Sequence, residues 1–328
     1  MKKTFLKAAG ILFFVAIYTA AFSQKQNVYF LKNDGKQVST KDSADYVRIL
    51  SEPDSGSVLY NVKDYYLNGK PRFVGKSAQV DPLVLDGSSI MFYPSGKRKE
   101  MATYNQGRKV DDVYNYFPNG KPYSHINYFL SRISIVMASG APVDPMPPYF
   151  VACNDSTGKS LTVNGSGHFI VYDDDMINIR EEGPVESGRK NGEWKGITLD
   201  SNRITYTEKY SGGVLVSGTS VDKFGIKYRY THQHEPAAQI KQDASLFQAI
   251  SLHRKQPSRV SQGLLTFWVN TDGSISNIAI TAKLDDASRL DILKAVNSKK
   301  WNPARFYGVP IPYHIMLPIS SKNGEPLD

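Results

Sequence analysis

Residues 261–319 have the sequence SQGLLTFWVNTDGSISNIAITAKLDDASRLDILKAVNSKKWNPARFYGVPIPYHIMLPI, and this stretch decides the fold of the C-terminal part of the chain. Apolar side chains occupy every second position from Leu265 to Val269, which is the period of a strand with one buried face. Asp272 and Gly273 follow, and an Asp-Gly pair predicts a hairpin turn because it tolerates positive φ at low cost. The stretch therefore begins with a strand and a tight turn.

The middle of the stretch predicts a return strand and then one helix. Isoleucines at 275, 278 and 280 mark the strand, and Asp286 is a good N-cap for the helix. The apolar residues expected on one face of that helix are Leu290, Leu293 and Val296. The segment Trp301-Asn-Pro-Ala304 is predicted to end the helix.

The last strand is predicted over 311–319, where apolar residues alternate again. Pro310, Pro312 and Pro318 share one parity, and N–H groups of one parity point to one side of a strand. Three donors are therefore missing from one side, whereas the other side keeps its donors. Because proline is tolerated where its nitrogen faces away from the ladder, we expect this strand at the edge of a sheet.

The order and spacing of these features resemble the C-terminal domain of the TonB family. The resemblance covers the strand with its Asp-Gly turn, the helix before W-N-P-A, and the segment YGVPIPYHIMLPI at 307–319. The positions that match the structural motif are Asp272, Gly273, Trp301, Pro303, Gly308 and Pro318. The resemblance implies a small α+β domain with strand order 2-1-3, whose edge strand pairs with a strand of an outer-membrane transporter or another envelope partner.

Two interpretations of the proline-rich edge remain open. In the first, the prolines only guard the edge against aggregation. In the second, a partner strand pairs there, because His314 and Met316 keep N–H groups on the guarded side. The residues of this candidate partner-binding edge are Tyr313, His314, Ile315, Met316 and Leu317.

The first 23 residues have the features of a targeting segment. Three lysines precede an apolar run from Ala8 to Phe22, and a small-x-small site ends at Ser23. This pattern predicts a signal peptide over 1–23 and export to the periplasm or cell envelope. The alternative is an uncleaved inner-membrane anchor, but the run is shorter than the roughly 20 apolar residues that span a bilayer.

The charge and cysteine content narrow the class of partner. The chain of 328 residues has a net charge of +9, and loss of the three lysines in 1–23 lowers it to +6. No basic cluster is interleaved with aromatic residues, so the sequence does not predict nucleic-acid binding. Cys153 is the single cysteine, which rules out an internal disulfide, and we expect it to be a small buried residue.

A repeated unit of aromatic, polar, glycine and basic residues fills 24–130. It occurs at 66–70, 93–97, 104–108 and 116–121, and glycines at 96, 107 and 120 lie 11 and 13 residues apart. These spacings predict two strands and a tight turn in each unit, with the aromatic residue packed on the next hairpin. The units resemble MORN-type repeats, which implies an elongated antiparallel β-meander and no catalysis.

Further composition changes divide the rest of the chain. A Pro-rich connector is predicted at 131–149, and hairpins resume over 150–233 with the segment ESGRKNGEWKG at 186–196. An apolar pattern over 236–253 predicts one helix, so the TonB-like domain is placed at 234–328. The expected fold is a mainly β region of hairpin repeats followed by a small α+β domain. This arrangement resembles envelope proteins of Bacteroidetes-type bacteria.

Motifs for cofactors and catalysis are incomplete in the sequence. Ser156–Ser160 resembles the end of a P-loop, but Cys153 stands where that loop needs glycine, and a strand is predicted next. His232 and His234 have the spacing of two ligands on one strand face, but no third ligand accompanies them. We therefore expect no cofactor, no metal and no enzymatic activity.

The sequence leaves three functional hypotheses. The first is a non-enzymatic periplasmic protein that binds an outer-membrane transporter or another envelope partner by strand addition. The second is an anchored TonB energy transducer, although no long Pro/Lys/Glu-rich spacer follows the apolar run. The third is an envelope hydrolase, which no residue pattern favours.

Overall fold

The computed structural model describes residues 26–129, 147–200, 202–239, 262–281, 286–298 and 300–320. The chain divides into two compact units, one of Met1–Gly167 with Ser187–Arg189 and one of His168–Glu186 with Lys190–Asp328. The predicted signal peptide, nearly all of the predicted connector and the predicted helix beyond Gln239 lie outside the described residues. Among the residues described, no helix is both long and apolar enough to cross a membrane.

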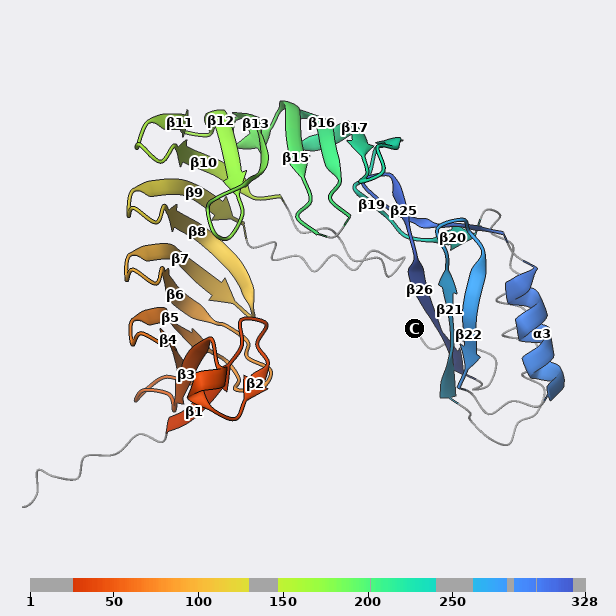
Figure 1. Cartoon of the computed structure of the whole chain (residues 1–328), viewed down its shortest axis with the longest axis horizontal. Coiled ribbons are helices and arrows are strands. Elements are labelled where there is room, and N and C mark those ends of the chain that lie inside the picture. The colour runs from red at the N-terminus through yellow and green to blue at the C-terminus, as the bar shows by residue number, and fades with distance from the viewer. Residues whose placement is uncertain are drawn as a thin grey trace, which may run out of the picture. The chain divides into compact units, whose positions relative to one another are not determined.

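The first unit is an antiparallel meander, coloured red to yellow-green in Figure 1. Strand β1 pairs with β2 and β3, and from β3 to β11 each strand pairs with the next one in the chain. The elements are β1 (Gln26–Leu31), β2 (Gln37–Val38), the 3-10 helix η1 (Lys41–Ser43), β3 (Tyr46–Ser51), β4 (Tyr60–Tyr66), β5 (Pro71–Ser77), β6 (Gly87–Phe92), β7 (Arg98–Asn105), β8 (Arg108–Tyr116), β9 (Pro122–Tyr128), β10 (Tyr149–Asn154) and β11 (Ser160–Val163).

Buried residues of this unit follow the alternation of the strands. Leu50, Val62 and Phe73, from β3, β4 and β5, form one core cluster. Cys153 in β10 is buried, as the sequence predicts. The segment after Ser156 turns directly into strand β11, so the backbone there does not form a P-loop.

The repeated aromatic residues join neighbouring hairpins through their hydroxyl groups. The Tyr66 hydroxyl donates to the Phe92 carbonyl oxygen at 2.7 Å, and the Tyr93 hydroxyl donates to the Tyr116 carbonyl oxygen at 2.7 Å. Each tyrosine therefore satisfies a backbone acceptor two strands further along the sheet. In these two units the aromatic residue therefore reaches the next hairpin through its hydroxyl, and the packing of its ring on the neighbouring unit stays a prediction.

The lysines of three repeats have a similar role at one edge of the meander. The lysine that ends one turn donates to a carbonyl oxygen of the next turn on the same edge. These bonds are Lys70 to Ser95 at 3.0 Å, Lys97 to Asn119 at 2.7 Å and Lys121 to Thr157 at 2.6 Å. The lysines thus tie successive turns together.

The predicted length of the repeat is wrong. The interval between Gly96 and Gly107 contains β7 alone, and the interval between Gly107 and Gly120 contains β8 alone. Spacings of 11 and 13 residues therefore correspond to one strand and one turn, not to two strands. Since turns alternate between the two edges of a meander, Gly107 lies on the edge opposite Gly96 and Gly120.

The second unit continues the antiparallel pattern. Strand β12 (Ser166–Tyr172) begins in the first unit and ends in the second. Strands β13, β15, β16, β17 and β18 then pair in that order. The elements are β13 (Ile179–Glu186), β14 (Arg189–Lys190), β15 (Gly192–Ile197), β16 (Thr205–Ser211), β17 (Val214–Val221) and β18 (Lys227–Tyr230).

Aromatic rings of these strands lie over glycines on the neighbouring strand. Gly196 pairs with Tyr206 and Gly218 pairs with Tyr230. A Cβ atom at Gly196 would lie 2.3 Å from the Tyr206 ring, and one at Gly218 would lie 2.2 Å from the Tyr230 ring. Only glycine leaves room for these rings, so the aromatic–glycine pattern fixes the register of the strands.

In the described residues from His234 to Ser320, the second unit contains one helix and three small sheets. The central sheet has the order β22-β21-β26, one sheet pairs β19 with β24 and β25, and the third pairs β20 with β23. The elements are β19 (His234–Glu235), β20 (Ala238–Gln239), β21 (Gln262–Val269), β22 (Ile275–Ile280), α3 (Asp286–Asn297), β23 (Trp301–Asn302), β24 (Ala304–Phe306), β25 (Val309–Ile311) and β26 (Tyr313–Ser320).

Helix α3 covers one face of the central sheet (Figure 1). The core between them contains Leu265, Phe267, Val269, Ile280, Ile292, Val296 and Trp301. Val296 is buried as expected, whereas Leu290 is 50% exposed and Ile292 is the buried residue one turn before Val296. Leu293 also packs against this core, so the predicted apolar face is confirmed at Leu293 and Val296 and wrong only at Leu290.

Three boundary predictions in this part are wrong. The helix ends at Asn297, and Trp301–Asn302 forms β23 while Ala304 begins β24, so this segment is not the end of the helix. The last strand breaks at Pro312 into β25 and β26, because proline cannot supply a ladder donor. Ala238–Gln239, at the start of the predicted 236–253 helix, is strand β20.

Candidate functional site

Strand β26 lies at the edge of the central sheet, as the proline pattern predicts. Its register with β21 runs without a shift and places Leu264 opposite Pro318. The Leu264 N–H donates to the Thr281 hydroxyl at 2.8 Å, and the Leu264 carbonyl oxygen accepts from the Thr281 N–H at 2.9 Å. Both backbone groups of Leu264 thus face β22, so the nitrogen of Pro318 points away from β21.

The same alternation decides which donors face the open edge. His314 and Met316 share the parity of Pro318, so their N–H and C=O groups also point away from β21. Tyr313, Ile315 and Leu317 have the other parity and face Val269, Phe267 and Leu265 of β21. Within the described residues no strand pairs with the outer side of β26. Between Pro312 and Pro318, the N–H donors of His314 and Met316 are therefore available to an added strand.

One proline does not belong to this edge. Pro310 lies in β25, opposite Arg305 of β24, in a different sheet. The prediction that Pro310, Pro312 and Pro318 remove three donors from one edge is therefore wrong. Pro312 precedes β26 and Pro318 lies near its end, so these two prolines bound the segment that carries the two donors.

The side chains of β26 divide between the two faces of the sheet. Ile315 and Leu317 pack against the core under α3. Met316 is 61% exposed on the other face, and the His314 ring stacks on Trp268 of β21 with 4.9 Å between ring centroids. Beside the free edge, the outer face thus presents an aromatic pair and a flexible apolar side chain.

Several residues of the predicted structural motif stabilise the hairpin turn of this sheet and pack against it. The Ser274 hydroxyl and the Ser274 N–H both donate to the Asp272 carboxylate. These bonds, of which the hydroxyl bond has the larger effect, hold the pKa of that carboxyl below its usual range. Gly273 has a φ of 81°, and a Cβ atom there would lie 2.3 Å from the Trp301 carbonyl oxygen and 4.0 Å from Cδ of Pro303. The hairpin turn therefore packs against the chain around β23, which only glycine permits.

A histidine–carboxylate pair lies on the sheet of the first unit but lacks a catalytic setting. His125 Nε2 lies 2.7 Å from Asp112, and Asn127 donates to the same carboxylate oxygen at 2.9 Å. The hydrogen bond from Asn127, which has the larger effect, and the contact with His125 both lower the pKa of Asp112. The pair lies on exposed strand residues, and a general base needs a positioned substrate group, which no described cleft there supplies.

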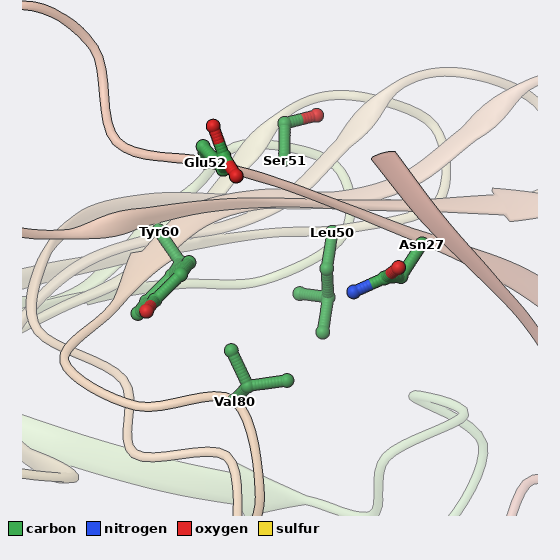
Figure 2. A pocket seen from close by; sticks show the side chains of 6 residues that line it. All are labelled: Asn27, Leu50, Ser51, Glu52, Tyr60 and Val80. Atoms are coloured by element: carbon green, nitrogen blue, oxygen red, sulfur yellow. The ribbon is translucent and has the colours of Figure 1, made fainter. Parts of the chain in front are cut away.

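One shallow cavity lies beside β1, β3 and β4, and Figure 2 shows Leu50, Tyr60 and Val80 around it. Its volume is about 210 Å³, and its other lining residues are Asn27, Ser51 and Glu52. Ligand pockets have volumes of roughly 300–1,000 Å³, so we assign no ligand to this cavity. In the described ranges no group of three or more His, Cys, Asp or Glu residues could hold a metal ion.

Comparison with known proteins adds no name to these features. No protein-family model matches the chain, and a search of curated proteins finds no match. The assignment of function therefore rests on the geometry of the chain.

Proposed function

We propose that the chain is a non-enzymatic protein-binding protein of the cell envelope. In this proposal the C-terminal domain is TonB-like, and it binds an outer-membrane transporter or another envelope partner by adding a partner strand to the free edge of β26. The hairpin sheets before it, proposed to be MORN-like repeats, form the platform that carries this domain.

The observation that supports the proposal is the outward direction of the His314 and Met316 backbone groups. An added strand gains main-chain hydrogen bonds from such an edge and specificity from alternate side chains. Pro312 and Pro318 limit the donors to a short segment, which matches a short partner strand. The exposed His314, Trp268 and Met316 side chains lie where alternate residues of that strand would make contact.

Site-specific photo-crosslinking in cells tests the proposal. A photoreactive amino acid replaces His314, and the matched control places it at Leu290, an exposed residue of α3. We expect one envelope protein to be crosslinked from position 314 and not from position 290. Met316→Pro removes an outward N–H and should reduce the yield, whereas Met316→Ala keeps that N–H and should retain most of it. Equal crosslinking from both positions, or a yield unaffected by Met316→Pro, would contradict strand addition.

A second candidate is an anchored energy transducer, in which the targeting segment stays uncleaved. The apolar run from Ala8 to Phe22 carries this alternative. Determination of the mature N-terminus and fractionation of the cells separate the two proposals. A mature chain that begins at Gln24 and is released by osmotic shock supports the periplasmic protein, and an intact N-terminus in the inner-membrane fraction supports the transducer.

A further inference from the structure

A fully buried carboxylate lies in the last hairpins before the C-terminal domain. Glu208 of β16 is 0% exposed. The Tyr210 and Tyr230 hydroxyls donate to it at 2.8 and 2.9 Å, and Gln233 Nε2 donates to its two oxygens at 2.9 and 3.0 Å. All these donors are neutral, and together they occupy both carboxyl oxygens of Glu208. Burial of such a group is unfavourable unless its bonds are made, so Glu208 depends on this cluster.

The tip of the β24–β25 hairpin lies against the same cluster. The Tyr307 N–H donates to the Gln233 carbonyl oxygen at 2.7 Å, and the Tyr307 carbonyl oxygen accepts from the Ser220 hydroxyl at 2.6 Å. The Tyr307 ring stacks on Tyr206 at 4.4 Å and meets the edge of Tyr230 at 5.7 Å. Gln233 therefore binds the buried carboxylate with its side chain and the hairpin tip with its backbone.

The backbone of the hairpin tip lies very close to β18 at Gly308, the residue after Tyr307. Gly308 has a φ of 77°, and a Cβ atom there would lie 3.1 Å from Tyr228 Cβ, 3.2 Å from the Arg229 carbonyl oxygen and 3.3 Å from the Tyr230 ring. This close approach leaves no space for a larger residue without movement of the β18 backbone. Figure 1 shows β25 leading from this region into β26.

We infer that Glu208, Gln233 and Tyr307 form a coupling joint that holds the start of β26 to hairpins β16–β18. Only residues 309–312 separate Gly308 from β26, so a fixed tip restrains the beginning of the partner-binding strand. The inference rests on the proposed function where it concerns partner binding: a partner strand on β26 then acts on the repeat hairpins through this joint. The joint itself is a property of the free chain and is measured without a partner.

Hydrogen exchange of the full-length chain, followed by mass spectrometry, tests the joint. Tyr307→Ala removes the ring between Tyr206 and Tyr230, and we expect exchange in β16–β18 and in β25–β26 to accelerate together by about tenfold. Val214→Ala, at a side chain 69% exposed on β17, is the matched control and should leave both regions unchanged. Faster exchange in β24–β26 alone, with β16–β18 unchanged, would overturn the inference.

A second variant keeps the test decisive if Tyr307→Ala does not fold. Ser220→Ala removes one hydrogen bond to the Tyr307 carbonyl oxygen and leaves every ring in place. Linked acceleration at both regions supports the joint, and acceleration confined to β17 contradicts it. The crosslinking experiment at position 314 does not require the joint. If the proposed partner strand is wrong, crosslinking fails, whereas the exchange experiments still test the joint.

Discussion

Gly308 carries two constraints, a φ of 77° and a close approach to β18, whereas Gly225 carries only a φ of 82° with nothing within 4 Å of its would-be Cβ. Gly225 is therefore a matched control for the cost of placing alanine at a positive φ. We expect Gly308→Ala to lower the free energy of unfolding by at least about 1 kcal/mol more than Gly225→Ala. Urea unfolding measures the difference, and equal losses for the two variants would show that the hairpin tip is not packed on β18.

We expect Tyr307 to make the stability of this region fall as the pH becomes alkaline. Burial raises its pKa to about 12 from an ordinary value of 10.0. Below pH 10.0 the phenol is neutral in both the folded and the unfolded chain, so its contribution to stability is complete. Between pH 10.0 and about 12 the unfolded chain loses the proton first, so stability should fall across this window.

Thermal unfolding at a series of alkaline pH values measures this fall. Tyr307→Phe keeps the ring and removes the titrating group, so its stability should decline less steeply than that of the natural chain over the same window. An identical decline would assign the alkaline loss to other tyrosines of the cluster.

At the scale of residues, sequence reasoning found those with a local rule and missed those set by tertiary contacts. Asp272 and Gly273 follow a turn rule that needs only neighbours in the chain. Glu208 and Gln233 have no such rule, because the donors to Glu208 come from β16, β18 and the segment after β18. The alternation of β16 indicates a core-facing position for Glu208, and a carboxylate at such a position is the one signal that sequence offered.

The tyrosines of the repeats act at the scale of the strand and its turn. Tyr93 is buried and donates to the Tyr116 carbonyl oxygen at 2.7 Å. Tyr93→Phe leaves that carbonyl without its donor, and we expect a loss of about 1 kcal/mol in the free energy of unfolding. Tyr114→Phe is the control, because Tyr114 is an exposed ring on the same sheet. Equal effects in chemical denaturation would mean that the hydroxyl does not join the hairpins.

The direction of the N–H groups along β26 gives an element-scale prediction that needs no partner. Ile315→Pro removes a donor that faces Phe267 of β21, and we expect it to destabilise the domain by about 2 kcal/mol or more. Met316→Pro removes a donor on the outer side and should cost much less. Thermal unfolding of the two variants compares them, and a larger loss for Met316→Pro would reverse the assigned directions.

Element types were more predictable than element boundaries. Alternation predicted β21, β22 and β26 because each has one buried and one exposed face. The strand at Trp301–Asn302 depends on pairing with β20, which lies far away in the sequence. The break at Pro312 separates β25, which pairs with the neighbouring β24, from β26, which pairs with the distant β21. The repeat length failed for a related reason, since glycine spacing alone does not tell one strand from two.

At the scale of the whole molecule, a mainly β chain of antiparallel hairpins ends in a three-stranded sheet, and within the described residues its strand β26 has no partner on its outer side. The turns and aromatic contacts recur from one hairpin to the next. The outward N–H groups of His314 and Met316 on β26 have no such repeat. Sequence reasoning placed this edge correctly because proline has a fixed backbone consequence. It assigned Pro310 to the edge because it counted this proline with the single strand predicted over 311–319, whereas the chain forms β25 and β26 there.

The central claim is that a partner strand pairs with the outer side of β26. Amide exchange at single-residue resolution, measured by NMR with and without the protein captured from position 314, tests it most directly. The account predicts new protection of the His314 and Met316 amides, with little change at Ile315 and Leu317, which already face β21. Protection that appears on β22, the opposite edge of the sheet, with His314 and Met316 unchanged, would contradict it.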